Sequence, residues 1–349
     1  MKIFYAIQAT GNGHISRAME LLPHLEKYGT VDIFLSGCNS TLQLNAPVAF
    51  RSKGASLIYT CNGSLDYKKT FSAFSFRRLL QEAKDLPVEE YDLVINDFEA
   101  ITSRACKIKN VNSIHFGHQA SFVSDNTPRP KKKNMIGEWI LKNYAQGSQN
   151  LGLHFDKYDE FIQPPVIKSE IWNGYITEKG HITVYLPSYC DNELIDIFSA
   201  IEDVRFEIFS RQSKTVSKNK NITLIPVDKL LFNTSFTSCS GIITGAGFET
   251  PAEAIFMNKK ILAIPIGGQY EQICNAAALK KLGVKTLHGI DENFRNEVKE
   301  WLEQPKPIYH ISFKSTQNII DKLMELHAKK DYSKNAEVKM DYKEDFSYN

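Results

Sequence analysis

The stretch GNGHISRA at residues 11–18 combines residue types that can do chemistry. Gly11 and Gly13 follow an apolar run, and His14 comes directly after them. Glycines at the end of a strand let the backbone approach a ligand closely, and a histidine there can act as a general base because the ordinary pKa of histidine is near ~6.5. The alternative is a histidine that caps the turn or packs beneath it.

A dinucleotide fingerprint would place G-x-G-x-x-G at the start of the helix. The third position of that motif is Ser16 here. The next apolar run, VDIFLSG, ends in Ser36 and Gly37 instead of an acidic residue. The sequence therefore disfavours NAD binding.

Side chains that could act with His14 lie in two later apolar runs. Asp97 lies near the end of DLVINDF, and His115 and His118 lie in SIHFGHQ. The carboxyl ends of parallel strands meet at one edge of a sheet, so Asp97 could lie beside His14 and orient its imidazole. The alternative for Asp97 is a loop cap. The two histidines are expected to reach the same edge, with one of them structural.

A second glycine turn follows the apolar run GIITGAG and contains Gly245 and Gly247. The residues after it predict a helix start with Thr250 as N-cap, Pro251 at the first helical position and Glu253 closing a capping box. Backbone N–H groups at such a start suit a diphosphate. The run KILAIPI then leads into the polar loop GGQYEQ, which makes a nucleotide-sized site plausible.

Short apolar runs alternate with helical patterns along the chain, which predicts parallel sheets in doubly wound α/β layers. In the first helical pattern Ile15, Ala18, Leu22 and Leu25 share one face. The expected strands of the first half are residues 2–8, 31–37, 56–60, 92–98 and 113–119, and those of the second half are residues 181–187, 205–210, 222–227, 241–247 and 260–266.

The stretch at residues 159–174 contains paired prolines and is predicted to be a linker. We therefore expect two Rossmann-like domains that face each other across a cleft. A last helix is expected at about residues 315–329, followed by a polar, aperiodic tail.

The N-terminal turn GNGHISRA and the segment at residues 241–284 resemble GT-B glycosyltransferases. They are most similar to the branch that contains the lipid-II-forming N-acetylglucosaminyltransferase and the UDP-glycosyltransferases. The resemblance implies an acceptor domain at 1–165, a nucleotide-sugar donor domain at 175–310, a C-terminal helix at 311–330 and a tail at 331–349. It implies inverting transfer of a hexosyl group from a UDP-sugar, without a bound metal or a permanent cofactor.

The resemblance also implies roles for individual residues. His14 would be the base, Asp97 its acidic partner, and Gly11 and Gly13 the turn that faces acceptor and diphosphate. The donor residues implied are Gly245, Gly247 and Thr250 for the diphosphate, Glu253 for the ribose, Gln269, Glu271 and Gln272 for the sugar, and the main chain of Val227 for the uracil. Ser188 and Arg211 are further phosphate candidates, and Asn275 follows the family pattern.

Two departures from the family pattern stand out. The first turn reads GNGH instead of a triple-glycine form, and the run VYLPSY lacks a glycine-rich loop.

Charge, cysteine content and the lengths of apolar runs exclude several other functional classes. The 349 residues carry a net charge of +2, so no global field favours nucleic acid. The six cysteines form no CxxC pair, and the triplet DFE at 97–99 is the nearest approach to an acidic metal motif, so no metal site is expected. The start MKIFYAIQA lacks a signal-peptide pattern and no run is long enough to span a membrane, so we expect a cytoplasmic protein.

Residues 127–146 place basic and apolar side chains together. This mixture suits a helix that rests on an anionic lipid surface, at the inner face of the cell membrane. The alternative is a solvated basic loop before a helix that packs on the core. The side chains concerned are Arg129, Lys131, Lys132, Lys133, Met135, Ile136, Trp139, Ile140 and Leu141.

Two other functions stay open at this point. One is a different enzyme of the same fold, such as a UDP-sugar epimerase or a phosphorylase, although nothing marks a lysine for pyridoxal phosphate. The other is a non-catalytic nucleotide-sugar-binding protein. The sequence does not identify the acceptor or the donor sugar.

Overall fold

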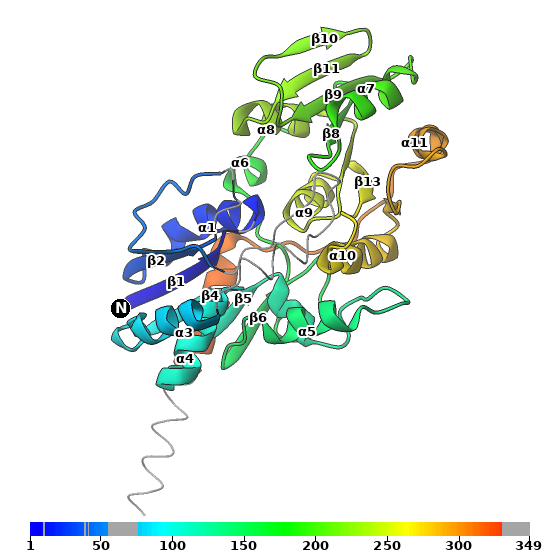
Figure 1. Ribbon diagram of the computed structural model, residues 1–349. Coiled ribbons are helices and arrows are strands. Elements are labelled where there is room, and N and C mark those ends of the chain that lie inside the picture. Colours follow the sequence, from blue (N-terminus) through cyan, green and yellow to red (C-terminus); the bar gives the residue numbers. More distant parts are fainter. Residues whose placement is uncertain (10, 38–39, 41, 55–75, 330–349) are drawn as a thin grey trace, which may run out of the picture.

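The computed structural model describes residues 1–349 apart from 10, 38–39, 41, 55–75 and 330–349. The chain forms two α/β halves in sequence order, each built on a seven-stranded sheet (Figure 1). The predicted strand at 56–60 and the predicted tail at 331–349 lie outside the described residues.

The sheet of the first half has the order β3-β2-β1-β4-β5-β6-β7, and its neighbouring strands pair in parallel. Its strands are β1 (Lys2–Gln8), β2 (Thr30–Ser36), β3 (Phe50–Ser52), β4 (Leu93–Asp97), β5 (Ile114–Gly117), β6 (Gln149–Leu153) and β7 (Ile162–Gln163). Its helices are α1 (Asn12–Leu25), α3 (Phe76–Asp85), η1 (Val88–Glu90), α4 (Ala100–Lys109), η2 (Gln119–Val123), α5 (Met135–Asn143) and α6 (Ser169–Trp172).

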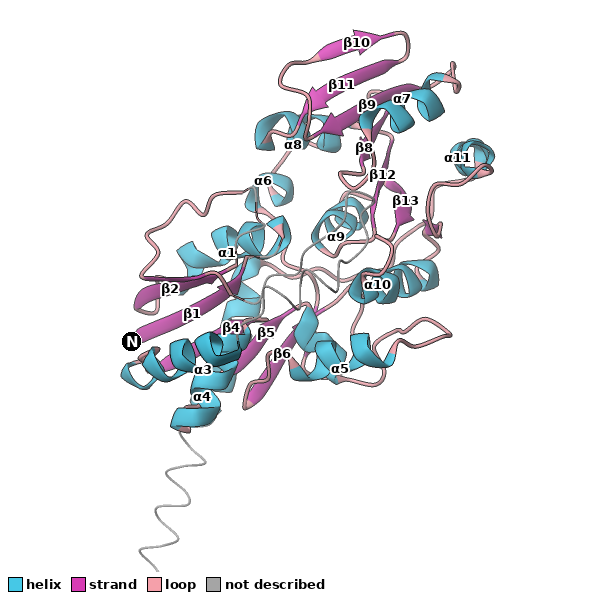
Figure 2. Cartoon of the chain, viewed as in Figure 1, coloured by secondary structure: helices cyan, strands magenta, loops and turns pink. Residues whose placement is uncertain are grey.

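Alternate residues of β1 show the layers of this half. Ile3, Tyr5 and Ile7 belong to a buried cluster with the apolar face of α1, whereas Phe4 and Ala6 pack with residues of α3 and α4. Helices therefore cover both faces of the sheet (Figure 2), which explains why β1 and β4 are buried along nearly their whole length. The predicted helical face of α1 is confirmed.

The sheet of the second half has the order β10-β11-β9-β8-β12-β13-β14 and is parallel except for the pair β10–β11. Its strands are β8 (His181–Tyr185), β9 (Arg205–Ser210), β10 (Ser217–Asn219), β11 (Ile222–Pro226), β12 (Gly241–Gly245), β13 (Lys260–Ile264) and β14 (Lys285–Thr286). Its helices are α7 (Asp191–Ser199), α8 (Lys229–Ser238), α9 (Glu249–Phe256), α10 (Tyr270–Lys281) and α11 (Phe294–Glu303).

The connection between the halves is more ordered than the paired prolines predict. β7 pairs with β6 and so extends the first sheet, and α6 follows it. After the second sheet the chain returns as a helix at residues 316–329, where Ile319, Ile320 and Leu323 join the buried cluster of β1 and α1. Two separate segments therefore tie the halves together.

The strand orders fix where ligands can bind. In the first sheet β1 lies between β2 and β4, and in the second sheet β8 lies between β9 and β12. At such points the connections leave towards opposite faces, and ligands of open α/β sheets bind outside the carboxyl ends of the strands there. The loops that follow β1, β4, β8 and β12 are therefore expected to bind ligands.

Candidate active site

His14 and Asp97 are hydrogen-bonded, with His14 Nδ1 2.8 Å from Asp97 Oδ1. His14 lies in the first turn of α1, and Asp97 is the last residue of β4. The register pairs Ile7 of β1 with Asp97, so the turn after β1 brings α1 directly over the end of β4. The predicted adjacency is confirmed, whereas the role of the pair in catalysis stays a prediction.

Arg17, which the sequence analysis missed, holds Asp97 from the other side. Its Nη2 lies 2.7 and 2.9 Å from the two carboxylate oxygens of Asp97, and its Nε donates to Oδ2 at 3.1 Å. Burial of Asp97 would raise its pKa, but Arg17 and His14 outweigh burial and lower that pKa to about 2. Asp97 is therefore an anion that can only accept in this hydrogen bond, so Nδ1–H of His14 is the donor, and in the neutral tautomer that this favours Nε2 is the acceptor atom.

Gly117 at the end of β5 leaves room for this ion pair. Its φ is +110°, and a Cβ at this position would lie 2.9 Å from Asp97 Oδ1 and 3.1 Å from Arg17 Nη2. A larger residue would both strain the backbone and displace the pair.

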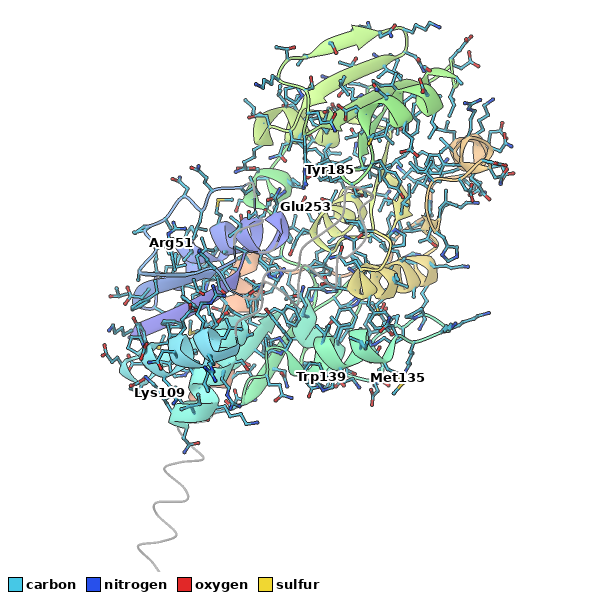
Figure 3. All side chains as sticks on the ribbon, viewed as in Figure 1. Arg51, Lys109, Met135, Trp139, Tyr185 and Glu253 are labelled. Carbon is cyan, nitrogen blue, oxygen red and sulfur yellow. The ribbon has the colours of Figure 1, made fainter. Side chains whose placement is uncertain are left out.

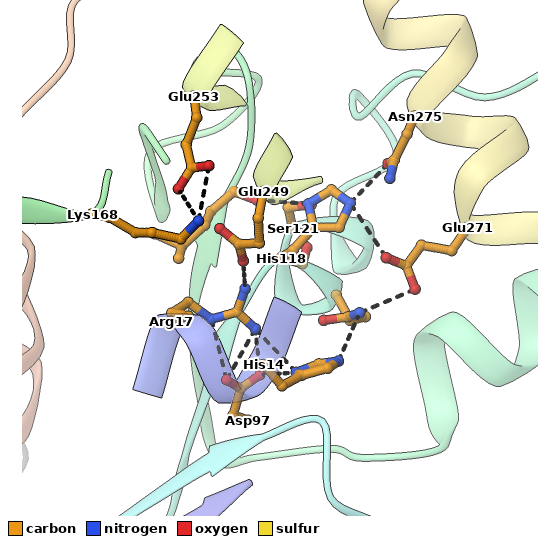
Figure 4. Close-up of polar contacts among 12 residues, drawn as sticks. His14, Arg17, Asp97, His118, Ser121, Lys168, Glu249, Glu253, Glu271 and Asn275 are labelled. Carbon is orange, nitrogen blue, oxygen red and sulfur yellow. Dashed lines mark hydrogen bonds and ion pairs between the residues drawn. The ribbon is translucent and has the colours of Figure 1, made fainter. Parts of the chain in front are cut away.

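Side chains of the second half meet this cluster (Figure 4). Arg17 Nη1 donates a hydrogen bond to Glu249 of α9. Gln119 Nε2 donates to Glu271 of α10 at 3.0 Å and lies 3.5 Å from His14 Nε2. The unprotonated nitrogen of His14 thus faces the junction between the halves.

His118 makes a second connection. Its ring stacks on Phe248 with 4.0 Å between ring centroids, and its Nε2 lies 2.7 Å from Asn275 Oδ1. Asn275 in turn donates to the carbonyl of Ala246 at 3.1 Å. His115 instead is buried within β5, and burial lowers its pKa to about 4, so it is a neutral core histidine. One of the two histidines is structural, as predicted, but His115 does not take the place at the edge that was expected for it.

The predicted capping box at the second glycine turn is wrong. The helix α9 begins at Glu249 with Phe248 as N-cap and no side-chain cap, so Thr250 lies inside the first turn. Gly245 ends β12, and a Cβ on Gly247 would meet nothing within 4 Å. The start of α9 therefore keeps backbone N–H groups without a side-chain cap beside an open glycine turn.

Glu253 does not cap α9 because it pairs with Lys168 of the connecting segment. Lys168 Nζ lies 3.0 Å from Oε1 and 3.1 Å from Oε2 of the carboxylate. Glu253 is buried, and burial raises its pKa against the opposing effect of Lys168. This long-range pair replaces the local cap.

The GGQYEQ loop contributes three side chains with different surroundings. Gln269 is the N-cap residue of α10, and Glu271 points to Gln119 across the junction. Gln272 Oε1 accepts a hydrogen bond from the backbone N–H of Ile266 at 3.0 Å and so stabilises the loop itself. Gln269 and Glu271 are therefore the better placed of the three to contact a ligand.

The remaining predicted donor residues follow strands of the second sheet. Ser188 follows β8, Arg211 follows β9 and Val227 follows β11. The backbone N–H of Val227 donates to Ser210 at 3.0 Å, so a main-chain contact of Val227 with a base would have to come from its carbonyl. All three lie at the same edge of the sheet as Gly245.

The basic and apolar segment is only partly exposed. The side chain of Arg129 is only 6% exposed and pairs with Glu138 at 2.6 Å, so the expectation that it joins a basic surface is wrong. Leu141 is buried, whereas Lys131, Lys132 and Lys133 are exposed together with Met135, Ile136 and Trp139. Figure 3 shows Met135 and Trp139 at the outer side of α5.

Within the described ranges, no three His, Cys, Asp or Glu side chains are grouped so that they could hold a metal ion. Of the helices that the structure describes, none combines the length and the apolarity that crossing a membrane demands. A cavity of about 710 Å³ between residues 155–164 and 311–325 is lined by none of the predicted site residues.

Comparison with known proteins gives the site its context. No curated protein matches the sequence. Three solved structures are similar over 93% of this chain and 99% of their own: UGT89C1 of Arabidopsis thaliana complexed with UDP (13% identity, TM-score 0.62), MurG of Acinetobacter baumannii (13%, 0.58) and the glycosyltransferase SnogD of Streptomyces nogalater (14%, 0.52).

These likenesses show that the chain and the three proteins have a common fold. Residues 1–304 match the family described as glycosyl transferase family 1. The chain therefore belongs to glycosyl transferase family 1 and has the GT-B fold.

Proposed function

We propose that this glycosyltransferase moves a hexosyl group from a UDP-sugar to an acceptor hydroxyl with inversion at the anomeric carbon. The observation that carries the proposal is the 2.8 Å hydrogen bond between His14 Nδ1 and Asp97 Oδ1. It leaves Nε2 as the basic atom, at the junction of the two halves.

In the proposed reaction the acceptor hydroxyl gives its proton to His14 Nε2 while its oxygen attacks the anomeric carbon. The bond between that carbon and the diphosphate oxygen breaks, and the electron pair leaves with UDP. Asp97 stabilises the imidazolium that forms, because it stays ionised beside Arg17. One attack from the side opposite the leaving group inverts the centre.

The donor would bind on the second half. The start of α9 has no side-chain cap, and the space beside Gly247 is open. Both observations support a diphosphate site at Gly245, Gly247 and Thr250. UGT89C1, which has the same fold, is known in complex with UDP and with UDP-L-rhamnose. We propose that Glu253 reaches the ribose while it keeps Lys168, and that Gln269 and Glu271 contact the sugar. No metal takes part in this proposal.

Thermal-shift titration tests the donor assignment. We expect UDP and one or more UDP-sugars to raise the melting temperature, because a ligand at ~100 times its Kd adds about 2.7 kcal/mol to the free energy of unfolding. GDP, dTDP, ADP and NAD are the controls. A shift with another nucleotide but none with UDP would contradict a uridine donor.

The outcome with UDP-sugars also separates the alternatives. Consumption of the donor with formation of an epimeric sugar would favour an epimerase. Binding of UDP-sugar without turnover towards any acceptor or water would favour a binding protein.

We also propose that the exposed face of α5 rests on an anionic membrane and brings the active site to a lipid-linked acceptor. Met135 is 86%, Ile136 66% and Trp139 63% exposed, and three lysines precede them. Apolar side chains beside cations are typical of helices at lipid interfaces. In a co-sedimentation assay, anionic vesicles should bind the protein, and a Met135→Ser, Ile136→Ser, Trp139→Ser variant should stay unbound. Equal binding of both proteins would contradict the contact.

A further inference from the structure

We infer that Arg17 is a positioning residue that makes the orientation of the His14–Asp97 pair depend on the docking of the donor half through Glu249. The inference deepens the proposed function and rests on it. The arrangement would prepare the base when the donor-binding helix α9 is in place, and would leave it less ordered when the halves separate.

The contacts of Arg17 point to this role. The side chain is 2% exposed and divides its donors between two carboxylates from different halves. Nε and Nη2 bind Asp97, whereas Nη1 binds Glu249 in the first turn of α9. Nη2 also lies 3.1 Å from His14 Nδ1. A planar guanidinium cannot turn towards one carboxylate without changing its geometry at the other.

The packing around the pair leaves little room for other geometries. The backbone of Gly117 packs so closely on Asp97 and Arg17 that there is no room for a side chain at this position. A Cβ on Gly13, next to His14, would lie 3.2 Å from Glu249 Cγ. The first turn of α1 therefore leaves no free space for a side chain on Gly13 beside Glu249, so a shift of α9 would act on Arg17 and on the surroundings of the turn that carries His14.

The charge state of Glu249 depends on its contact with Arg17. Burial is the largest effect on Glu249 and, together with Glu253 and Asp97, raises its pKa to about 7 against the opposing effects of Arg17 and His14. The Arg17 guanidinium lowers this pKa and so favours the charged form of the carboxylate. The Arg17–Glu249 contact is thus the polar link between the proposed diphosphate turn and the proposed base.

Two variants with one control test the inference. Glu249→Gln keeps the shape and removes the charge, and Arg17→Lys keeps a cation but cannot bind both carboxylates in a fixed plane. Asn233→Ala is the control, because it removes another hydrogen bond between the halves, from Asn233 of α8 to Glu170 of α6 at 2.7 Å, and leaves the His14 cluster intact. The probe reaction is release of UDP from UDP-sugars with water as acceptor.

We expect Glu249→Gln and Arg17→Lys to lower kcat about 10- to 100-fold while UDP affinity changes less than about threefold, because a displaced base impairs the chemical step and not donor binding. Asn233→Ala should keep wild-type kcat. In 15N spectra of labelled histidine, the His14 nitrogens should report a protonated Nδ1 in the wild type and shift in both variants.

A lower melting temperature with unchanged kcat and unchanged His14 signals would overturn the inference and leave the proposed function standing. If the wild type binds UDP-sugars but releases no UDP from any of them, with water or with any hydroxyl acceptor, the proposed function fails. The His14 signals then decide alone: a shift in Glu249→Gln supports the coupling, and no shift overturns it.

Discussion

Asp97 keeps a negative charge in a fully buried position because donors surround it. Arg17 supplies hydrogen bonds to both of its oxygens, and His14 supplies one more. A side chain that was only a loop cap would bind backbone N–H groups. Glu99, two residues later, does that, since it accepts from Ile101 and Thr102 and caps α4.

This difference gives the first prediction. Asp97→Asn should lower kcat by about 10³-fold or more, because the amide no longer fixes the tautomer of His14. It should also lower the free energy of unfolding by about 3 kcal/mol, since Arg17 loses a buried partner. Glu99→Gln is the matched control, with a loss of about 1 kcal/mol as a weakened cap and kcat near wild type. Equal effects of both substitutions on kcat would contradict the assignment.

Burial of the His115 ring leads to a prediction of how the free energy of unfolding depends on pH. Its pKa is about 4 in the folded protein, below the ordinary value near ~6.5, so the unfolded chain binds the proton more readily. The stabilising effect is therefore complete above about pH 6.5 and is lost as the pH falls towards 4. Denaturant unfolding of His115→Asn should show a weaker decline over that range by up to about 3 kcal/mol. An unchanged decline would contradict a buried neutral ring.

At the scale of elements, the sequence predicted most strands and the helices that carry His14 and the donor turn. Apolar runs were enough for the buried strands, because burial demands an apolar composition that is visible locally, whereas the exposed strand β10 has no such run and was not predicted. The start of α9 was predicted wrongly because T-P-x-E is a local signal, and the partner of Glu253 is Lys168, 85 residues away in the chain. Arg17 was missed for the same reason: its partners Asp97 and Glu249 are remote in sequence, and nothing near Arg17 marks it.

The turn after β5 allows an element-scale prediction. Gly117→Ala should lower both the free energy of unfolding, by about 2 kcal/mol, and kcat, because the methyl group enters the space of Asp97 and Arg17. Gly180→Ala is the control. Gly180 has φ +77° and its Cβ position lies 3.8 Å from the nearest group, so only backbone strain is added. Thermal melts and UDP release distinguish the two, and a full loss of kcat in Gly180→Ala would speak against the steric account.

At the scale of the whole molecule, the chain closes on itself. The helix at 316–329 leaves the second half and packs on the first, where Leu323 is 1% exposed. Tyr28 donates a hydrogen bond to Asp321 at 2.8 Å in the same place. The sequence predicted this helix but not where it packs, because an apolar face shows that a helix is buried and does not identify the surface that buries it.

Leu323→Ala should therefore destabilise the protein by about 3 kcal/mol through a cavity beneath α1, although it lies outside both predicted domains. Lys322→Ala, on the exposed side, should change stability by less than about 0.5 kcal/mol. Chemical denaturation of both variants measures the difference. Equal stability of the two would show that the helix does not hold the first half.

The two halves together make the site, and the proposed base lies where they meet. The most direct test is UDP release from a saturating UDP-sugar by the wild type and by His14→Ala, with UDP affinity measured for both proteins. We predict that UDP affinity changes less than about threefold while turnover falls by about 10³-fold, as loss of a general base implies. Equal turnover of the two proteins, with equal affinity, would contradict the account.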